Sequence, residues 1–285
     1  MNTILVPTDF SDLSNNALEF AVEMARYAVA DVQAVHFVEI LHEEATLVTA
    51  DTAVVGTTDE TLFNIQLMRS NKNKLQEITN RFENDSVKVK ADLAGNGFLK
   101  GIQEFVRQNE VSAILIGTTG EQNLQEFFSG NHTEQLIEHL DIPVISIQKK
   151  EHFNEIKKVV MAFDVVHEYY SPSALVKMKD ALLNFNARIQ MVTVIEDPKN
   201  RDFAQEALEE LRRRMQLNEA TLHVLENTDV EGTLKNYVKE QNASAIALLT
   251  EAKSGLWRFV QGSLATHVTK DFDIPVLTLN KKHFE

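Results

Sequence analysis

Short apolar runs alternate with longer amphipathic stretches along the 285 residues of this chain. The first run, 3–7, predicts a buried strand, and the stretch after it carries Ala17, Ala21 and Ala25 at helical spacing behind a serine N-cap at Ser11 or Ser14. The same alternation continues to the middle of the chain. It predicts strands at 32–38, 87–93, 113–116 and 144–147, and helices at 61–82, around 102–106 and around 136–140.

A second set of the same elements follows a charged, patternless segment at 149–155. Its expected strands are 159–163, 189–194, 221–225, 245–249 and 276–279, and its expected helices begin after Ser171-Pro172 and span 203–217 and 231–240. Asp273-Ile274-Pro275 lies 132 positions after Asp141-Ile142-Pro143, so the two halves align without a gap there. The sequence therefore predicts two similar domains, 1–150 and 151–285, each an α/β unit with a doubly wound, five-stranded parallel sheet.

Glycines follow the fourth strand of the first half at Gly117, Gly120 and Gly130, and a helix is expected next. Glycines let a backbone turn sharply and approach an anion closely, and the first N–H groups of a helix point at it. Turn chemistry alone would also explain three glycines in a loop. Asp9 at the end of the first strand favours a site, because both turns lie at the carboxyl edge of a parallel sheet, where ligands bind.

With these residues the chain resembles a tandem member of the universal stress protein family. That family carries Gly-x2-Gly-x9-Gly-Ser/Thr after the fourth strand and an early aspartate after the first. Asp9, Gly117, Gly120 and Gly130 fit the pattern, whereas Asn131 stands where the family has serine or threonine. The resemblance implies a Rossmann-like fold and an adenine nucleotide held by these residues, with Asp9 at the ribose or base and Val38 lining the adenine pocket.

Each half has lost a different part of that pattern. In the second half Asp164 stands where Asp9 does and Gly262-Ser263 matches Gly130-Asn131, but Leu249 and Ala252 replace the first two glycines. Because a bulky side chain blocks backbone approach, we expect the first half to be the competent site and the second to be degenerate. Asn131 can still cap a helix and donate hydrogen bonds.

Several site residues have a second interpretation. Asp9 either binds the nucleoside or caps the helix that follows it, and for Asp164 capping is the better interpretation. Val38 is either a pocket residue or ordinary core. His132 either contacts a phosphate or is a solvated histidine at a helix start.

Composition narrows the function further. The net charge of −14 disfavours nucleic acid and anionic membranes as partners, and a polyphosphate then needs local cations, amides or a divalent ion such as Mg²⁺. There are no cysteines, no run of about 18 apolar residues and no signal-peptide pattern, so we expect a cytoplasmic protein. The nine histidines show no metal-ligand spacing, and we expect no metal site of protein ligands.

These observations together predict a cytoplasmic stress-response protein that binds ATP or another adenine nucleotide in its first half, through Asp9, Val38, Gly117, Gly120, Gly130, Asn131 and His132. It would act as a sensor or regulator, with a regulatory protein as partner and the polar stretch 41–59 as a flap over the site. No catalytic residues stand out, and a slow ATPase or phosphotransferase and a dimerisation scaffold without nucleotide remain the alternatives. In the family the fifth strands of two domains commonly pair, so 144–147 and 276–279 are expected to meet in an intrachain pseudo-dimer, and a homodimer stays open.

Overall fold

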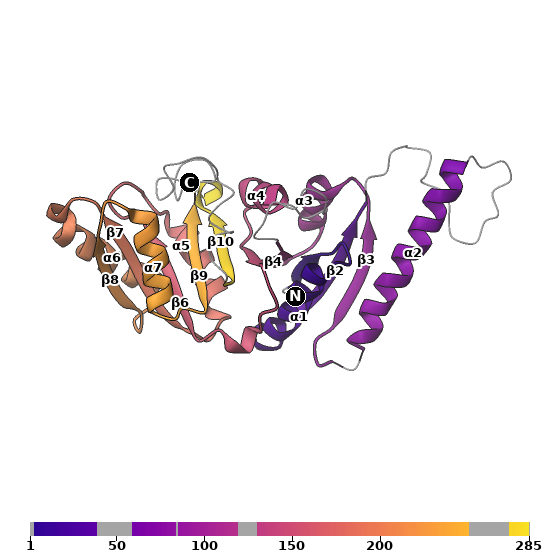
Figure 1. Cartoon of the computed structure of the whole chain (residues 1–285), viewed down its shortest axis with the longest axis horizontal. Helices are drawn as coiled ribbons and strands as arrows, with labels where there is room; N and C mark the ends of the chain where they lie inside the picture. The colour runs from indigo at the N-terminus through magenta and orange to yellow at the C-terminus, as the bar shows by residue number, and fades with distance from the viewer. Residues whose placement is uncertain (1–2, 39–58, 84, 119–129, 251–273, 285) are drawn as a thin grey trace.

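Two similar halves lie side by side in the computed structural model, which describes residues 3–38, 59–83, 85–118, 130–250 and 274–284 (Figure 1). The first half contains β1 (Thr3–Pro7), α1 (Asp12–Ala28), β2 (Asp31–Phe37), α2 (Asp59–Arg81), β3 (Val89–Ala94), α3 (Phe98–Gln108), β4 (Val111–Gly117), α4 (Gly130–His139) and β5 (Val144–Ile147). The second contains β6 (Lys158–Phe163), α5 (Pro172–Leu183), β7 (Arg188–Ile195), α6 (Arg201–Met215), β8 (Thr221–Glu226), α7 (Val230–Glu240), β9 (Ala245–Thr250) and β10 (Val276–Asn280). The predicted strands are confirmed to within two residues at every end.

All ten strands join in one sheet, in the order β3-β2-β1-β4-β5-β10-β9-β6-β7-β8. Within each half the neighbouring strands are parallel, as the alternation of strands and helices predicted. At the seam β5 and β10 pair antiparallel, with Leu277 opposite Ile145. The expected meeting of the two last strands is therefore confirmed, and the chain forms its own pseudo-dimer.

Helices cover both faces of the sheet. On one face α1, α2, α5 and α6 pack over a single core cluster that runs through both halves. On the other face α3 and α4 cover one cluster in the first half, and α7 covers a separate one in the second. Among the described residues, the cluster on the first of these faces is thus shared by the two halves, and the clusters on the other face are separate.

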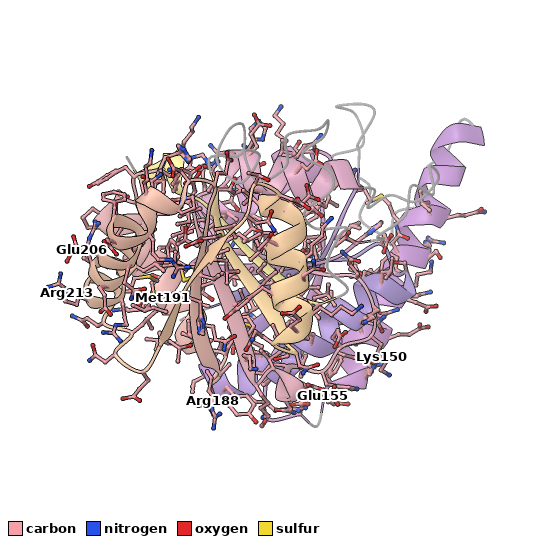
Figure 2. The ribbon with its side chains drawn as sticks, turned by 60° about the vertical axis from the view of Figure 1, so that its left-hand side comes forward. Lys150, Glu155, Arg188, Met191, Glu206 and Arg213 are labelled. Carbon is pink, nitrogen blue, oxygen red and sulfur yellow. The ribbon has the colours of Figure 1, made fainter. Side chains whose placement is uncertain are left out.

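Helix α6 illustrates how the pattern of the sequence produces this packing. Leu208, Leu211 and Met215 recur at helical spacing and are buried. Figure 2 shows Glu206 and Arg213 on the outer side of this helix, while Met191 of β7 lies buried in the core. None of the helices in the described ranges is long and apolar enough to cross a membrane.

An aromatic contact anchors the segment that links the halves, which the sequence had suggested to be patternless. Phe153 is only 2% exposed, and its ring lies 5.5 Å from those of Phe20 and Tyr27 and 5.4 Å from that of Phe185. Phe153 therefore fixes the linker to the shared core.

We expect Phe153→Ala to lower the free energy of unfolding by about 3–5 kcal/mol, because it empties a buried aromatic site. Leu183→Ala is the matched control, since Leu183 is 62% exposed, and it should change stability by less than about 0.5 kcal/mol. Urea unfolding monitored by circular dichroism measures both. Equal midpoints for the two variants would contradict the anchoring role.

A polar contact fixes the same linker to α1. His152 Nδ1 lies 2.8 Å from Glu23 Oε1, and this hydrogen bond and the charge of Glu23 raise the pKa of His152 above 6.5. Because the folded-state pKa is the higher one, the contact stabilises the junction fully below about pH 6.5 and is lost as the pH rises through the raised pKa.

Glu23→Gln should return the pKa of His152 towards its ordinary value. An NMR titration of the imidazole carbon signals measures this, with His223 as an internal reference in the same spectra. An unchanged His152 titration in the variant would contradict the contact.

Candidate functional site

A turn at the carboxyl end of β1 presents Asp9. Its Oδ1 accepts hydrogen bonds from the backbone N–H and the hydroxyl of Ser11, at 3.0 and 2.6 Å. Ser11 in turn is the N-cap of α1 and accepts from the N–H of Ser14 at 3.2 Å. Asp9 is therefore not the cap of the helix. Ser11, which is the cap, holds Asp9 in place, and both of its hydrogen bonds go to Oδ1 of Asp9 and not to Oδ2.

Next to Asp9 lies a small cluster that the sequence did not reveal. Phe10 has a left-handed backbone with φ of 68°, unusual for a bulky residue, and its ring lies 4.6 Å from that of His36 on β2. Lys74 of α2 places its Nζ 4.9 Å from the centre of the Phe10 ring. Lys74 is one of several lysines on a polar helix, so no sequence signal distinguished it.

These neighbours set the charge balance around His36. Its Nδ1 lies 2.7 Å from the carbonyl of Thr8, which fixes the ring at the end of β1. Burial lowers the pKa of His36 below 6.5, and the positive charge of Lys74 acts in the same direction, against that carbonyl and Asp9. His36 is therefore neutral at pH 7, and Lys74 is a cation close to the carboxyl edge of β1 and β2.

Val38 follows β2 directly and is partly buried. Its N–H donates to the carbonyl of Ala94 at 2.8 Å, and its carbonyl accepts from the N–H of Gly97 at 3.1 Å. Both backbone groups of Val38 are thus hydrogen-bonded within the protein.

Gly117 ends β4, and the structure gives a different reason for this glycine than approach to a phosphate. A β-carbon here would lie 2.5 Å from the carbonyl carbon of Leu13 and 3.0 Å from the nitrogen of Ser14. The first turn of α1 therefore packs directly on the backbone of Gly117. The steric requirement comes from the fold itself, and it exists with no ligand present.

The structure describes only part of the rest of the predicted loop. Gly120 lies outside the described residues, whereas Gly130 and Asn131 open α4. The ring of His132 packs edge-on against Phe98 of α3 with centroids 4.2 Å apart, and burial lowers its pKa below 6.5. His132 is thus partly buried, and the interpretation as a solvated histidine is wrong.

The second half has the same strand registers but a different turn after its first strand. Ala113 of β4 lies opposite Ile4, and Ala245 of β9 lies opposite Val159, so Asp9 and Asp164 occupy equivalent positions. Helix α1 begins three residues after Asp9, whereas α5 begins eight residues after Asp164. The five extra residues move the start of the helix along the chain, and Leu249, the equivalent of Gly117, is fully buried.

Two residues of this longer turn, Glu168 and Tyr170, join Asp164 and Lys281 in a buried polar group at this carboxyl edge, which we call the closing cluster. The N–H of Asp164 donates to the hydroxyl of Tyr170 at 2.9 Å, and that hydroxyl donates to Glu168 Oε2 at 3.1 Å. Lys281, 2% exposed, lies just after β10 with its Nζ 3.5 Å from Glu168 Oε2 and 5.0 Å from the centre of the Tyr170 ring.

Burial of the closing cluster has two consequences. It raises the pKa of Tyr170 well above 10, with the charge of Glu168 acting in the same direction, so the phenol stays protonated and donates. It also makes the ion pair expensive to break, because loss of either partner leaves a buried charge uncompensated.

The expectation that Asp164 caps the following helix is wrong. Ser171 is the N-cap of α5, and the carboxylate of Asp164 instead contacts the backbone N–H and ring of His167, at 3.1 and 2.9 Å for Oδ1. Gly262 and Ser263, the other predicted residues of the second site, lie outside the described residues. No group of three or more residues that could hold a metal ion occurs in the described part of the chain.

The family model for the universal stress protein family matches residues 1–148, which is more than half of the chain. The chain belongs to the universal stress protein family. A curated universal stress protein of Methanocaldococcus jannaschii is 26% identical over 149 residues, which cover 51% of this chain and 81% of that protein.

Solved structures extend the likeness of fold to the whole chain. A universal stress protein from Archaeoglobus fulgidus matches with a TM-score of 0.71 and 17% identity, covering 98% of both chains. A universal stress protein from Pseudomonas aeruginosa matches with a TM-score of 0.61 and 13% identity, covering 97% of this chain and 92% of that one. The family-type α/β fold therefore spans both halves of this universal stress protein.

We expect Gly117→Ala to lower stability by about 1–3 kcal/mol, because the new methyl group meets the backbone of α1, which cannot rotate away. Gly232→Ala is the matched control. There a β-carbon would meet the side chain of Asp229, the N-cap of α7, which can turn aside.

In the control the lost cap, worth about 1 kcal/mol, is offset by the similar gain in helix propensity from glycine to alanine, so we expect little net change. Thermal unfolding without nucleotide measures both variants. A Gly117→Ala protein as stable as the wild type would contradict the packing role.

Proposed function

We propose that this universal stress protein binds one adenine nucleotide, with ATP as the first candidate, in its first half, and acts in the cytoplasm as a sensor or regulator in the stress response. The observation that carries the proposal is the difference between two equivalent edges of the sheet. In the first half a serine holds Asp9 at the edge, and in the second the closing cluster fills it.

The predicted site residues of the first half take different roles in this proposal. Asp9 accepts hydrogen bonds from the ribose or base through the oxygen that Ser11 does not use. The first N–H groups of α4, at Gly130, Asn131 and His132, and the loop with Gly120 bind the phosphates, because a helix N-terminus attracts anions. Val38 contributes its side chain to the adenine pocket, as the family resemblance implies.

Lys74 supplies positive charge near the proposed site, which a chain of net charge −14 needs to bind a polyphosphate. A protein of charge −14 repels a polyphosphate at long range unless the site carries local positive potential. Lys74 lies over the ring of Phe10, the residue after Asp9, and supplies one positive charge there. A Mg²⁺ ion bound by the phosphates is the second source in this proposal.

The second half is proposed to bind no nucleotide. To bind at the equivalent edge of the second half, a nucleotide would displace the phenol of Tyr170 and the ammonium of Lys281, and would leave Glu168 buried without its partner. Breaking a buried ion pair in this way costs about 3–5 kcal/mol. We therefore expect one nucleotide per chain.

Asp9→Asn should reduce the affinity for ATP at least tenfold, because a hydrogen bond to a charged group contributes about 1.5–3 kcal/mol. Asp164→Asn is the matched control at the equivalent position of the second half and should leave the affinity within twofold of wild type. Isothermal titration calorimetry measures affinity and stoichiometry together. Two equivalents of ATP per chain, or equal losses in both variants, would contradict the proposed function.

A further inference from the structure

The last residues of the described chain, Asn280–Phe284, connect the two halves, and we call them the C-terminal segment. Its Asn280 donates through Nδ2 to the carbonyl of Glu138 at 3.2 Å, and His283 Nε2 lies 3.0 Å from the same carbonyl. Glu138 belongs to the last turn of α4 in the first half. Figure 1 shows the C-terminus beside the seam, near α4.

The residues between and after these two contacts bind the second half instead. Lys281 donates to the carbonyl of Tyr169 at 2.8 Å and forms the ion pair with Glu168 in the closing cluster. The carbonyl of Phe284 accepts from the hydroxyl of Ser173 in the first turn of α5, at 3.0 Å. One short segment therefore holds the last turn of α4 on one side and the closing cluster on the other.

Helix α4 lies between the proposed phosphate site and the C-terminal segment. Its ten residues span about 15 Å, and Leu136 and Leu140 fix it in the core of the first half. It begins at Gly130, at the proposed phosphate site, and ends at the carbonyl that Asn280 and His283 bind. A displacement of the first turn of α4 therefore also displaces its last turn.

We propose that α4 and the C-terminal segment couple the two halves, so that nucleotide in the first half stabilises the closing cluster in the second. The proposal rests on the proposed nucleotide site. Phosphates bound by the first turn of α4 hold that helix in one position, and its last turn then holds Asn280, and with it Lys281, more firmly. The second half is then the element that reports occupancy, through the surface of the loop 165–170.

Coupling of this kind is reciprocal, because each site changes the affinity of the other by the same factor. Weakening the contact between the C-terminal segment and α4 must therefore weaken nucleotide binding, although neither Asn280 nor His283 belongs to the proposed site. His283→Ala is the first variant because His283 is exposed and its loss leaves the core intact. Asn280→Ala with His283→Ala removes both hydrogen bonds to Glu138.

The test is hydrogen exchange followed by mass spectrometry on the full chain, with and without saturating ATP and Mg²⁺. In wild type we expect ATP to slow exchange of the loop 165–170 and of the C-terminal segment at least threefold. In the double variant that slowing should disappear, while exchange at 9–14 beside the proposed site is still slowed. Unchanged exchange of the loop in ATP-bound wild type would overturn the proposal.

Affinity measurements give a second readout. The double variant should bind ATP at least threefold more weakly than wild type, and His283→Ala should lie between them. Ser173→Ala is the matched control, since it releases the same segment from α5 but not from α4, and its affinity should stay within twofold of wild type. An unchanged affinity in the double variant, or an equal loss in Ser173→Ala, would overturn the coupling.

The two proposals fail in distinguishable ways. If calorimetry detects no ATP binding to wild type, the proposed function fails and the coupling fails with it. If ATP binds at one site and the loop 165–170 does not respond, only the coupling is overturned.

Discussion

The number of residues between the first strand of each half and the following helix controls much of what differs between the halves. In the first half α1 begins so soon after Asp9 that its first turn lies on the end of β4, and only glycine fits at position 117. In the second half five more residues precede α5, a leucine is accepted at the equivalent position, and Tyr170 enters the edge of the sheet. One local change in the chain thus separates an edge that presents a carboxylate from an edge that is filled.

The antiparallel pair β5 and β10 joins the two unlike halves. It joins two parallel sheets into one and places the residues after β10 beside the last turn of α4. The shared core on one face and the aromatic contacts of Phe153 make the halves a single body around that seam. Two domains linked by a free tether would have no such contact between the end of one and the helix of the other.

Much of the fold could be predicted from the sequence, because strands and helices have different hydrophobic periods and their ends are marked by clear capping residues. Ser171-Pro172 marks the start of α5, and apolar runs such as that of β4 mark buried strands. The family resemblance supplied the pairing of the last strands and the candidate residues. Ser11 holds Asp9 at the edge of the sheet, and the role of Asp9 towards a nucleotide stays a prediction.

What could not be predicted depends on contacts between residues far apart in the chain. Nothing in the sequence around Glu168 shows that it pairs with Lys281, which lies more than a hundred residues away. The packing contact that requires glycine at position 117 could not be predicted for the same reason, since its neighbour Leu13 is distant in sequence. Phe153 stands among charged residues, and only its partners on α1 and after α5 reveal its role.

A crystal structure of the chain grown with saturating ATP and Mg²⁺ tests the central claim most directly. The account predicts nucleotide at the edge formed by the ends of β1 and β4, beside Asp9, with Tyr170 and Lys281 in place in the second half. Nucleotide in the second half with those two side chains displaced, or a first half that stays empty, would contradict it.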